Sequence, residues 1–398
     1  MLNKKEIAKG IFYVGVNDRQ KQLFENYIPI PQGVSYNSYL IIDEKITLID
    51  TVDVSMCGTY ITKLETLLNG KSIDYLVVNH MEPDHAGSVG LLCERFPNMI
   101  VVGNPKTFTM IDGYFDLKNQ RLTVNEGDSI SLGDRKLTFY TAPMVHWPEV
   151  MVAYEDKDKI LFSADAFGTF GTLDGSFLDS DLNTERYWSE MRRYYACIVG
   201  KFGKATQNAI NKLSTLSINT ICSTHGPVWR RDIQQAITLY DKWSKYETEE
   251  GVVIAYGTMY GNTQQLAEAF AEGVVDGSVS NVVIHNVSTT DASYILADIF
   301  KYKGIAIGSP TYMNEIYPNI ESLLKKIEHR GIPNHIYACF GSRTWAGGSV
   351  KILNEFGQRM KWEIVSAPID NLQGIKNSDY QAAYQQGLAM AKQLIAVR

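Results

Sequence analysis

The chain has 398 residues, more than one hydrophobic core ordinarily supports, so two or more domains are expected. It carries 38 basic and 44 acidic side chains, and the formal net charge of −6 argues against a general nucleic-acid-binding surface. No apolar run reaches the roughly 20 residues that cross a membrane, and the apolar stretch near the N-terminus is too short for a signal peptide. We therefore expect a cytoplasmic protein with neither a nucleic-acid nor a membrane partner.

The first part of the chain has the pattern of a β-rich domain. Short apolar segments separated by turns predict strands at 39–42, 46–49, 75–78, 99–102, 137–140, 151–154 and 160–162. Two longer stretches, 184–199 and 233–245, predict helices. The polar run 245–250 ends this pattern, so the predicted domains are 1–249 and 250–398.

The second part alternates strands with helices. Predicted strands at 252–255, 282–284, 304–307 and 336–340 are interleaved with predicted helices at 264–273, from 293, at 319–329, at 349–360 and from about 378. Such alternation is typical of βαβ units, in which helices cover both faces of a parallel sheet. We therefore predict one doubly wound parallel sheet for this domain.

A compact polar motif, His80-x-Glu82-x-Asp84-His85, follows the predicted strand 75–78. Pro83 favours an extended backbone at Glu82. In an extended segment, His80, Glu82 and Asp84 would point to one side, and a turn would carry His85 towards a second metal ion.

Three more polar residues, His146, Asp165 and His225, also follow strand-like runs. Any one of them is more simply explained as a surface or hydrogen-bonding residue. Together with the motif they place four of the seven histidines in strand-end positions with carboxylates nearby. The remaining histidines lack such companions and are interpreted as structural or solvated (His285, His329 and His335). The pattern predicts a two-metal site built from four histidines and three carboxylates.

This ligand order resembles that of the metallo-β-lactamase superfamily, H-x-[HE]-x-D-H followed by H, D and H. The successive spacings are 61 residues from His85 to His146, 19 from His146 to Asp165 and 60 from Asp165 to His225. The zinc hydrolases of that superfamily usually have histidine where this chain has Glu82. A carboxylate there favours iron, since oxygen donors suit harder cations. The glutamate matches the flavodiiron proteins, also called A-type flavoproteins.

Three loops of the second domain resemble those that bind FMN in flavodoxins. The first, after the strand 252–255, resembles the phosphate loop [TS]-x-T-G-N-T, with Tyr260 in place of the usual threonine. Backbone N–H groups at a helix N-terminus and the hydroxyls of Thr258 and Thr263 suit a phosphate. One Gly/Ser/Thr-rich loop is commonplace, whereas three in this order predict a flavin site. The predicted residues are Thr258, Met259, Tyr260, Gly261, Asn262 and Thr263, then Ser309, Pro310, Thr311, Tyr312 and Asn314, then Ser342, Arg343, Thr344, Trp345, Ala346 and Gly347.

The resemblance to flavodiiron proteins covers essentially the whole chain. It implies a metallo-β-lactamase-like αββα sandwich followed by a flavodoxin-like doubly wound sheet. It also implies that one iron is bound by His80, Glu82 and His146 and the other by Asp84, His85 and His225, with Asp165 as the bridge. The five cysteines form no C-x-x-C pair, so the class without a fused rubredoxin is indicated. An external donor, such as rubredoxin or a reduced flavin or deazaflavin system, is then required.

The implied activity is reduction of O2 to water, of NO to N2O, or of both, with FMN relaying electrons to the two irons. The family pairs its subunits head to tail, which implies a homodimer or a dimer of dimers. Tyr194 and Tyr195 are candidate proton donors, although packing on a helix face explains them more simply.

Two other function classes compete with this one. The first is a metallo-β-lactamase-type zinc hydrolase, such as a thioesterase, with an appended flavodoxin-like module. Glu82 and the flavin loops argue against it. The second is an electron carrier with a degenerate, metal-free first domain, which the complete ligand set excludes. The preference between O2 and NO and the identity of the donor stay open.

Overall fold

The computed structural model describes residues 6–397, and the chain divides into two compact units after Ser244. The division falls before the predicted boundary at residue 249. The polar run 245–250 belongs to the second unit, because its residue Glu249 already begins strand β17 (Glu249–Tyr256). Across residues 6–397, no helix combines the length and the apolar character needed to span a membrane.

Two β-sheets form the first unit. The larger has the strand order β1-β2-β7-β8-β9-β10-β11 and the smaller β12-β13-β14-β15-β16. The Tyr39 ring of the larger sheet lies 5.3 Å from the Phe162 ring of the smaller, and both side chains are buried, so the two sheets enclose a common core. The strands are β1 (Glu6–Ala8), β2 (Ile11–Tyr13), β7 (Tyr39–Ile41), β8 (Thr47–Ile49), β9 (Tyr75–Val77), β10 (Ile100–Gly103), β11 (Arg121–Thr123), β12 (Ser129–Ser131), β13 (Lys136–Thr141), β14 (Met151–Glu155), β15 (Ile160–Phe162) and β16 (Thr220–Cys222).

Two small antiparallel pairs accompany these sheets: β3 (Val16–Asp18) with β6 (Val34–Tyr36), and β4 (Leu23–Phe24) with β5 (Ile28–Pro29). The turn between β4 and β5 has positive φ at Glu25 and Asn26, as tight hairpins require. Phe24 of this hairpin lies with its ring 5.4 Å from that of His225, so the hairpin covers one end of the sandwich.

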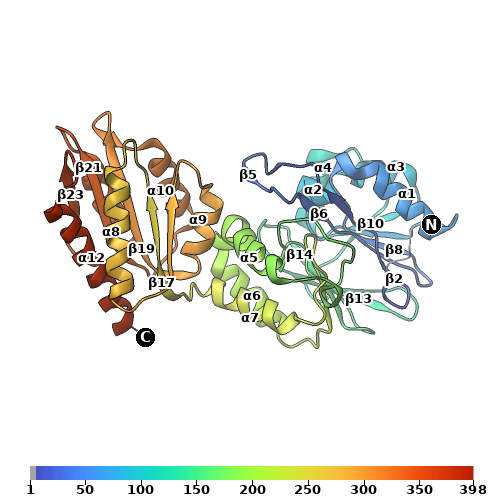
Figure 1. The fold of residues 1–398 in the computed structure, drawn as a ribbon. Coiled ribbons are helices and arrows are strands. Elements are labelled where there is room, and N and C mark those ends of the chain that lie inside the picture. Colours follow the sequence, from blue (N-terminus) through green and yellow to red (C-terminus); the bar gives the residue numbers. More distant parts are fainter. Residues whose placement is uncertain (1–5, 398) are drawn as a thin grey trace. The chain divides into compact units, whose positions relative to one another are not determined.

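Helices cover the outer faces of both sheets (Figure 1). In α1, Tyr60, Leu64 and Leu68 are buried at four-residue intervals, which places one apolar stripe against the sheet. The helices of this unit are α1 (Cys57–Leu68), α2 (Pro83–Ala86), α3 (Val89–Arg95), α4 (Pro105–Tyr114), α5 (Glu185–Tyr194), a π-helical segment (Tyr195–Val199), α6 (Gly203–Leu213) and α7 (Ile233–Ser244). With helices outside two stacked sheets, the unit is the predicted metallo-β-lactamase-like sandwich.

The second unit has a parallel sheet in the order β18-β17-β19-β21-β22, which is a flavodoxin-like doubly wound topology, as predicted. β23 pairs with β21, and β20 forms a short antiparallel pair with β19. The strands are β17, β18 (Val282–Asn286), β19 (Tyr302–Tyr312), β20 (Glu315–Ile316), β21 (Ile336–Arg343), β22 (Glu363–Ile364) and β23 (Ile369–Leu372).

The helices of this unit pack on both faces of its sheet. α8 (Asn262–Asp276) and α12 (Asn377–Ala396) lie side by side (Figure 1). Phe270 and Met390 of these helices share a core with Phe340 of the sheet. Gly273 and Gly387 let the two helices approach, because a Cβ at either would meet backbone of the other helix at 2.0 Å. The remaining helices are α9 (Ala292–Ile299), α10 (Pro318–Arg330) and α11 (Ser349–Arg359).

Candidate metal centre and flavin pocket

The ligand motif begins directly after β9 and then turns into a helix. Glu82 is extended, with φ −60° and ψ 136°, but α2 begins at Pro83. Proline is favoured at the first position of a helix, where its missing N–H costs nothing. The prediction that His80, Glu82 and Asp84 point to one side of an extended segment is therefore wrong. Asp84 lies in the helical turn and faces the same way as His85.

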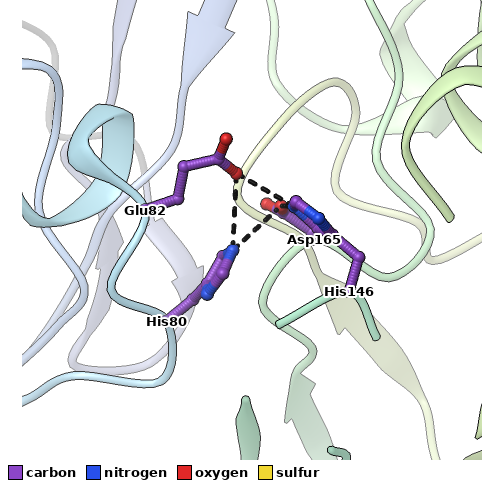
Figure 2. Close-up of side chains that lie close together, drawn as sticks. All are labelled: His80, Glu82, His146 and Asp165. Atoms are coloured by element: carbon purple, nitrogen blue, oxygen red, sulfur yellow. Dashed lines mark hydrogen bonds and ion pairs between the residues drawn. The ribbon is translucent and has the colours of Figure 1, made fainter. Parts of the chain in front are cut away.

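The first ligand set consists of His80, Glu82, His146 and Asp165, whose donor atoms lie within 4.8 Å of one another (Figure 2). His146 Nε2 is 3.0 Å from Glu82 Oε2 and 3.2 Å from Asp165 Oδ2. His80 Nε2 lies 3.4 Å from each of the same two oxygens. Two donors bound at about 2.1 Å to one ion are themselves about 3.0–3.4 Å apart. These spacings therefore fit a shared metal ion.

The second ligand set consists of Asp84, His85 and His225. Asp84 Oδ1 is 3.2 Å from His85 Nε2, and its Oδ2 is 3.2 Å from His225 Nε2. Asp165 Oδ1 lies 2.8 Å from His85 Nε2, while its Oδ2 faces the first set. The two oxygens of this one carboxylate are thus divided between the two sets, which is the arrangement of a bridging ligand.

Because these ligands are buried, their negative charges must be balanced by metal ions or by protons. Burial opposes charging of His146, yet hydrogen bonds to Asp165 and Glu82 raise its pKa to about 9. The pKa of Asp165 lies well below its usual range, because charged His85 and the hydrogen bond from His146 outweigh burial. Among residues 6–397, His85 Nε2, His225 Nε2 and both Asp84 carboxylate oxygens are buried without a hydrogen-bond partner. Buried nitrogen and oxygen atoms without a hydrogen-bond partner are expected of metal ligands, because the metal ion takes the place of that partner.

The ligands lie at the ends of strands from both sheets. Those of the motif follow β9 of the larger sheet, whereas His146 lies between β13 and β14, Asp165 follows β15 and His225 follows β16, all in the smaller sheet. The remaining histidines lie elsewhere. His285 pairs with Asp298 at 2.9 Å, His335 is buried against backbone carbonyls, and His329 is exposed.

Glu149 is a polar residue at this centre that was not predicted from the sequence. Glu149 is buried, and its Oε1 lies 2.7 Å from His80 Nδ1. The sequence offers one signal for a role of Glu149 at this centre, namely its position three residues after His146. Tyr194, a candidate proton donor, has its ring 5.6 Å from that of His225, and its buried hydroxyl has no hydrogen-bond partner in the described chain. Burial and the charges of Asp165, Glu82 and Asp84 raise its pKa, so the phenol keeps its proton.

The predicted flavin loops meet at a cavity of about 470 Å³ in the second unit. Two of them are shorter than predicted, because β19 continues to Tyr312 and β21 to Arg343. The cavity is lined by Thr258, Met259, Tyr260, Asn262, Pro310, Thr311, Tyr312, Met313, Asn314, Ser342, Arg343, Thr344, Trp345 and Ala346. All but Met313 were predicted as flavin-binding residues.

Four predicted residues do not line the cavity. Thr263 and Ser309 are fully buried behind it, and the Thr263 and Ser342 hydroxyls lie 2.9 Å apart. Gly261 has φ +93° in the turn before α8, a conformation that favours glycine. A Cβ at Gly347 would meet Arg343 Cδ at 2.4 Å, so this position keeps the third loop close to the strand. These residues shape the pocket from behind.

The pocket fits a planar amphipathic ligand with an anionic tail. Side chains of Tyr260, Met313 and Trp345 at its rim are 92%, 81% and 78% exposed, and such surfaces suit stacking on a flat ring. The N-terminus of α8 and the Thr258 hydroxyl, which accepts from Gly261 N–H at 3.0 Å, form a turn suited to a phosphate. The two ligand sets fit two iron ions, and this pocket fits FMN.

Comparison with known proteins gives the same two-part organisation. Residues 34–226 match the model of the ODP family beta lactamase, and residues 254–387 match that of flavodoxin. A nitric oxide reductase of Moorella thermoacetica is 32% identical over 98% of both chains. The rubredoxin oxygen:oxidoreductase of Desulfovibrio gigas superposes with a TM-score of 0.95 at 30% identity over 99% of both chains. The flavodiiron protein of Giardia intestinalis also superposes with a TM-score of 0.95, at 27% identity over 100% of this chain and 98% of that one. With both domains matched in this order and the likeness extending over essentially the whole chain, the chain belongs to the flavodiiron proteins.

Proposed function

We propose that this chain reduces O2 to water, NO to N2O, or both, at a non-haem di-iron centre supplied with electrons by FMN. The observation that carries the proposal is the position of Asp165, with Oδ2 beside the first ligand set and Oδ1 beside the second. One carboxylate shared in this way would hold two metal ions close enough for both to act on a single small molecule.

The proposed ligands offset most of the charge of two ferrous ions. Glu82, Asp84 and Asp165 supply three negative charges from buried positions, and the four imidazoles supply neutral donors. When bound, the two irons supply electrons and open positions for a diatomic gas, and FMN relays electrons from the donor. The chain's own residues hold these groups, exclude bulk water by burial, and keep a proton on Tyr194 Oη beside His225.

Glu82 decides between this function and the zinc hydrolase. A carboxylate in the first ligand set favours a harder cation than a histidine would. In addition, a hydrolase has no use for the 470 Å³ pocket and its aromatic rim in the second unit. The hydrolytic alternative is therefore not favoured.

The proposed partners of the chain are an electron donor and further copies of the chain itself. We propose an external donor, such as rubredoxin or a reduced flavin or deazaflavin system, and a cytoplasmic head-to-tail homodimer or dimer of dimers. Support for a covering partner comes from the exposed apolar side chains of Tyr260, Met313 and Trp345 at the pocket rim, since such clusters commonly mark interaction sites. Sedimentation equilibrium tests the assembly: a monomer at micromolar concentration would contradict it.

The function is tested by composition and by gas consumption. The purified protein should contain about two irons and one FMN per chain. Oxygen-electrode and NO-electrode assays, run in parallel with the same reduced donor, should then show consumption of at least one gas, and their ratio gives the preference. Stoichiometric zinc together with thioesterase activity would overturn the proposal.

A further inference from the structure

Glu149 lies behind one of the metal-ligand histidines. Its Oε1 is 2.7 Å from His80 Nδ1 and also accepts from Met81 N–H at 2.9 Å. Both the Glu149 and His80 side chains are fully buried. His80 Nδ1 must donate to this carboxylate, because Nε2 faces Glu82 and Asp165. The contact therefore fixes both the tautomer and the orientation of the ring.

The second ligand set has no such carboxylate. His225 Nδ1 lies 2.7 Å from the backbone carbonyl oxygen of Ser35, which is neutral. His85 Nδ1 has no hydrogen-bond partner among residues 6–397. The other buried carboxylate nearby, Asp50, accepts from Asn79 N–H at 2.7 Å and from Asn79 Nδ2 at 3.0 Å, and not from a ligand histidine.

The two sets are otherwise matched. Each has two histidines and one carboxylate of its own, Glu82 in the first and Asp84 in the second, and both share Asp165. Burial raises the pKa of Asp50, and the charges of His85 and His80 oppose this rise. Asp50 therefore acts on a ligand of each set, but its hydrogen bonds are to Asn79. The difference between the sets is therefore the direct hydrogen bond from the His80 imidazole to Glu149.

From this difference we propose that Glu149 is a positioning residue that makes the two metal sites unequal. A carboxylate hydrogen-bonded to a ligand imidazole makes the imidazole a stronger donor. The site with His80, Glu82 and His146 then holds its iron more tightly and stabilises the oxidised ion more. It is the first to be oxidised and the last to release its metal. This inference rests on the proposed di-iron function, which it deepens.

Glu149→Gln removes the charge and keeps the shape. The amide oxygen can replace Oε1 and accept from both His80 and Met81, while the amide nitrogen takes the place of Oε2, which has no hydrogen-bond partner here. The matched control is Asp298→Asn, which removes the negative charge from a carboxylate that pairs with His285, a histidine of the second unit that is not a proposed ligand.

The test follows iron release from the anaerobic di-ferrous holoprotein to a ferrous chelator. The parent should lose its irons in two phases. In Glu149→Gln the slow phase should accelerate about 10- to 100-fold, the usual effect of removing such a supporting contact. The fast phase should be unchanged, and Asp298→Asn should keep parental kinetics.

A redox titration of the ⁵⁷Fe-loaded protein, followed by Mössbauer spectroscopy, gives a second readout. Oxidation of the first iron should need a higher potential in Glu149→Gln, so that the two steps move closer together. Equal release of both irons in the parent, or an unchanged slow phase in Glu149→Gln, would overturn the inference. Fewer than two irons in all three proteins would instead overturn the proposed function.

Discussion

The hydroxyl oxygens of Thr263 and Ser342 lie 2.9 Å apart, joining the start of α8 to the end of β21. Thr263 is fully buried, and Ser342 lines the flavin pocket. This hydrogen bond connects the first and third loops of the pocket across 79 residues of sequence. It therefore sets the spacing between the phosphate end of the pocket and its wall at Ser342.

Replacing Thr263 with valine should loosen this connection. The shape is kept, but the Ser342 hydroxyl loses its partner, which should cost about 1–3 kcal/mol of unfolding free energy. FMN should also bind more weakly. Thermal unfolding and fluorescence titration with FMN measure the two effects. In a double-mutant cycle with Ser342→Ala, the two losses should be less than additive; strict additivity would mean that the contact contributes nothing.

Replacing Asp165 with asparagine should empty both metal sites. The amide offers one oxygen where the carboxylate presents Oδ2 to the first ligand set and Oδ1 to the second. Iron content should fall from about two to well below one per chain. Elemental analysis measures this, with Asp298→Asn as the control, since Asp298 pairs with His285 in the second unit. Retention of both irons by Asp165→Asn would exclude a bridging role.

Changing Glu82 to histidine should alter which metal the centre binds more than how many ions it binds. The first ligand set would then have three imidazoles, and its preference should move from iron towards zinc. After loading with equal amounts of Fe(II) and Zn(II), the zinc-to-iron ratio should rise about tenfold or more. Glu126→His, which replaces an exposed carboxylate paired with Lys212, should leave the ratio unchanged.

Metal uptake should release protons near neutral pH. Burial opposes protonation of His85 and His146, but the charges of Asp84 and Asp165 around His85 and the hydrogen bonds from His146 to Asp165 and Glu82 raise both pKa values to about 9 in the metal-free chain. Binding must displace these protons, so iron affinity should rise with pH up to about 9. A pH indicator in weak buffer detects the release during loading.

The same groups predict how the stability of the metal-free protein depends on pH. Their folded-state pKa of about 9 lies above the unfolded value of about 6.5. Their contribution to stability is therefore complete below about pH 6.5 and is lost as pH rises through about 9. Urea unfolding at pH 6 and pH 10 should show the loss in metal-free protein and a smaller change in the loaded protein.

Sequence reasoning succeeded where function depends on polar residues at strand ends. The seven proposed metal ligands stand out because histidine is rare in this chain and each follows an apolar run. In the second unit the four long strands and all five helices were predicted, because buried strands and long helices alternate regularly, but the short strands β20, β22 and β23 were not. In the first unit, α1, α3, α4 and α6 were not predicted. Each presents only a narrow apolar stripe in a polar segment, as α1 does with Tyr60, Leu64 and Leu68.

Contacts between residues that lie far apart in the chain could not be predicted from the sequence. Glu149 touches His80 across 69 residues, and no local pattern relates them. The course of α2 was misjudged for a different reason. Pro83 was interpreted through its effect on Glu82, whereas its own preference for the first helical position carries Asp84 into the turn with His85.

The distribution of ligands over two sheets has a consequence for biogenesis. His80, Glu82, Asp84 and His85 follow the larger sheet, and their partners follow the smaller one, the last of them being His225. A chain emerging from the ribosome therefore cannot complete both sites until His225, near the end of the first unit, has been synthesised and both sheets have come together. The full complement of iron is then acquired late, and only by molecules whose first unit is already assembled. A cell's supply of the loaded enzyme would accordingly be limited by maturation as well as by synthesis.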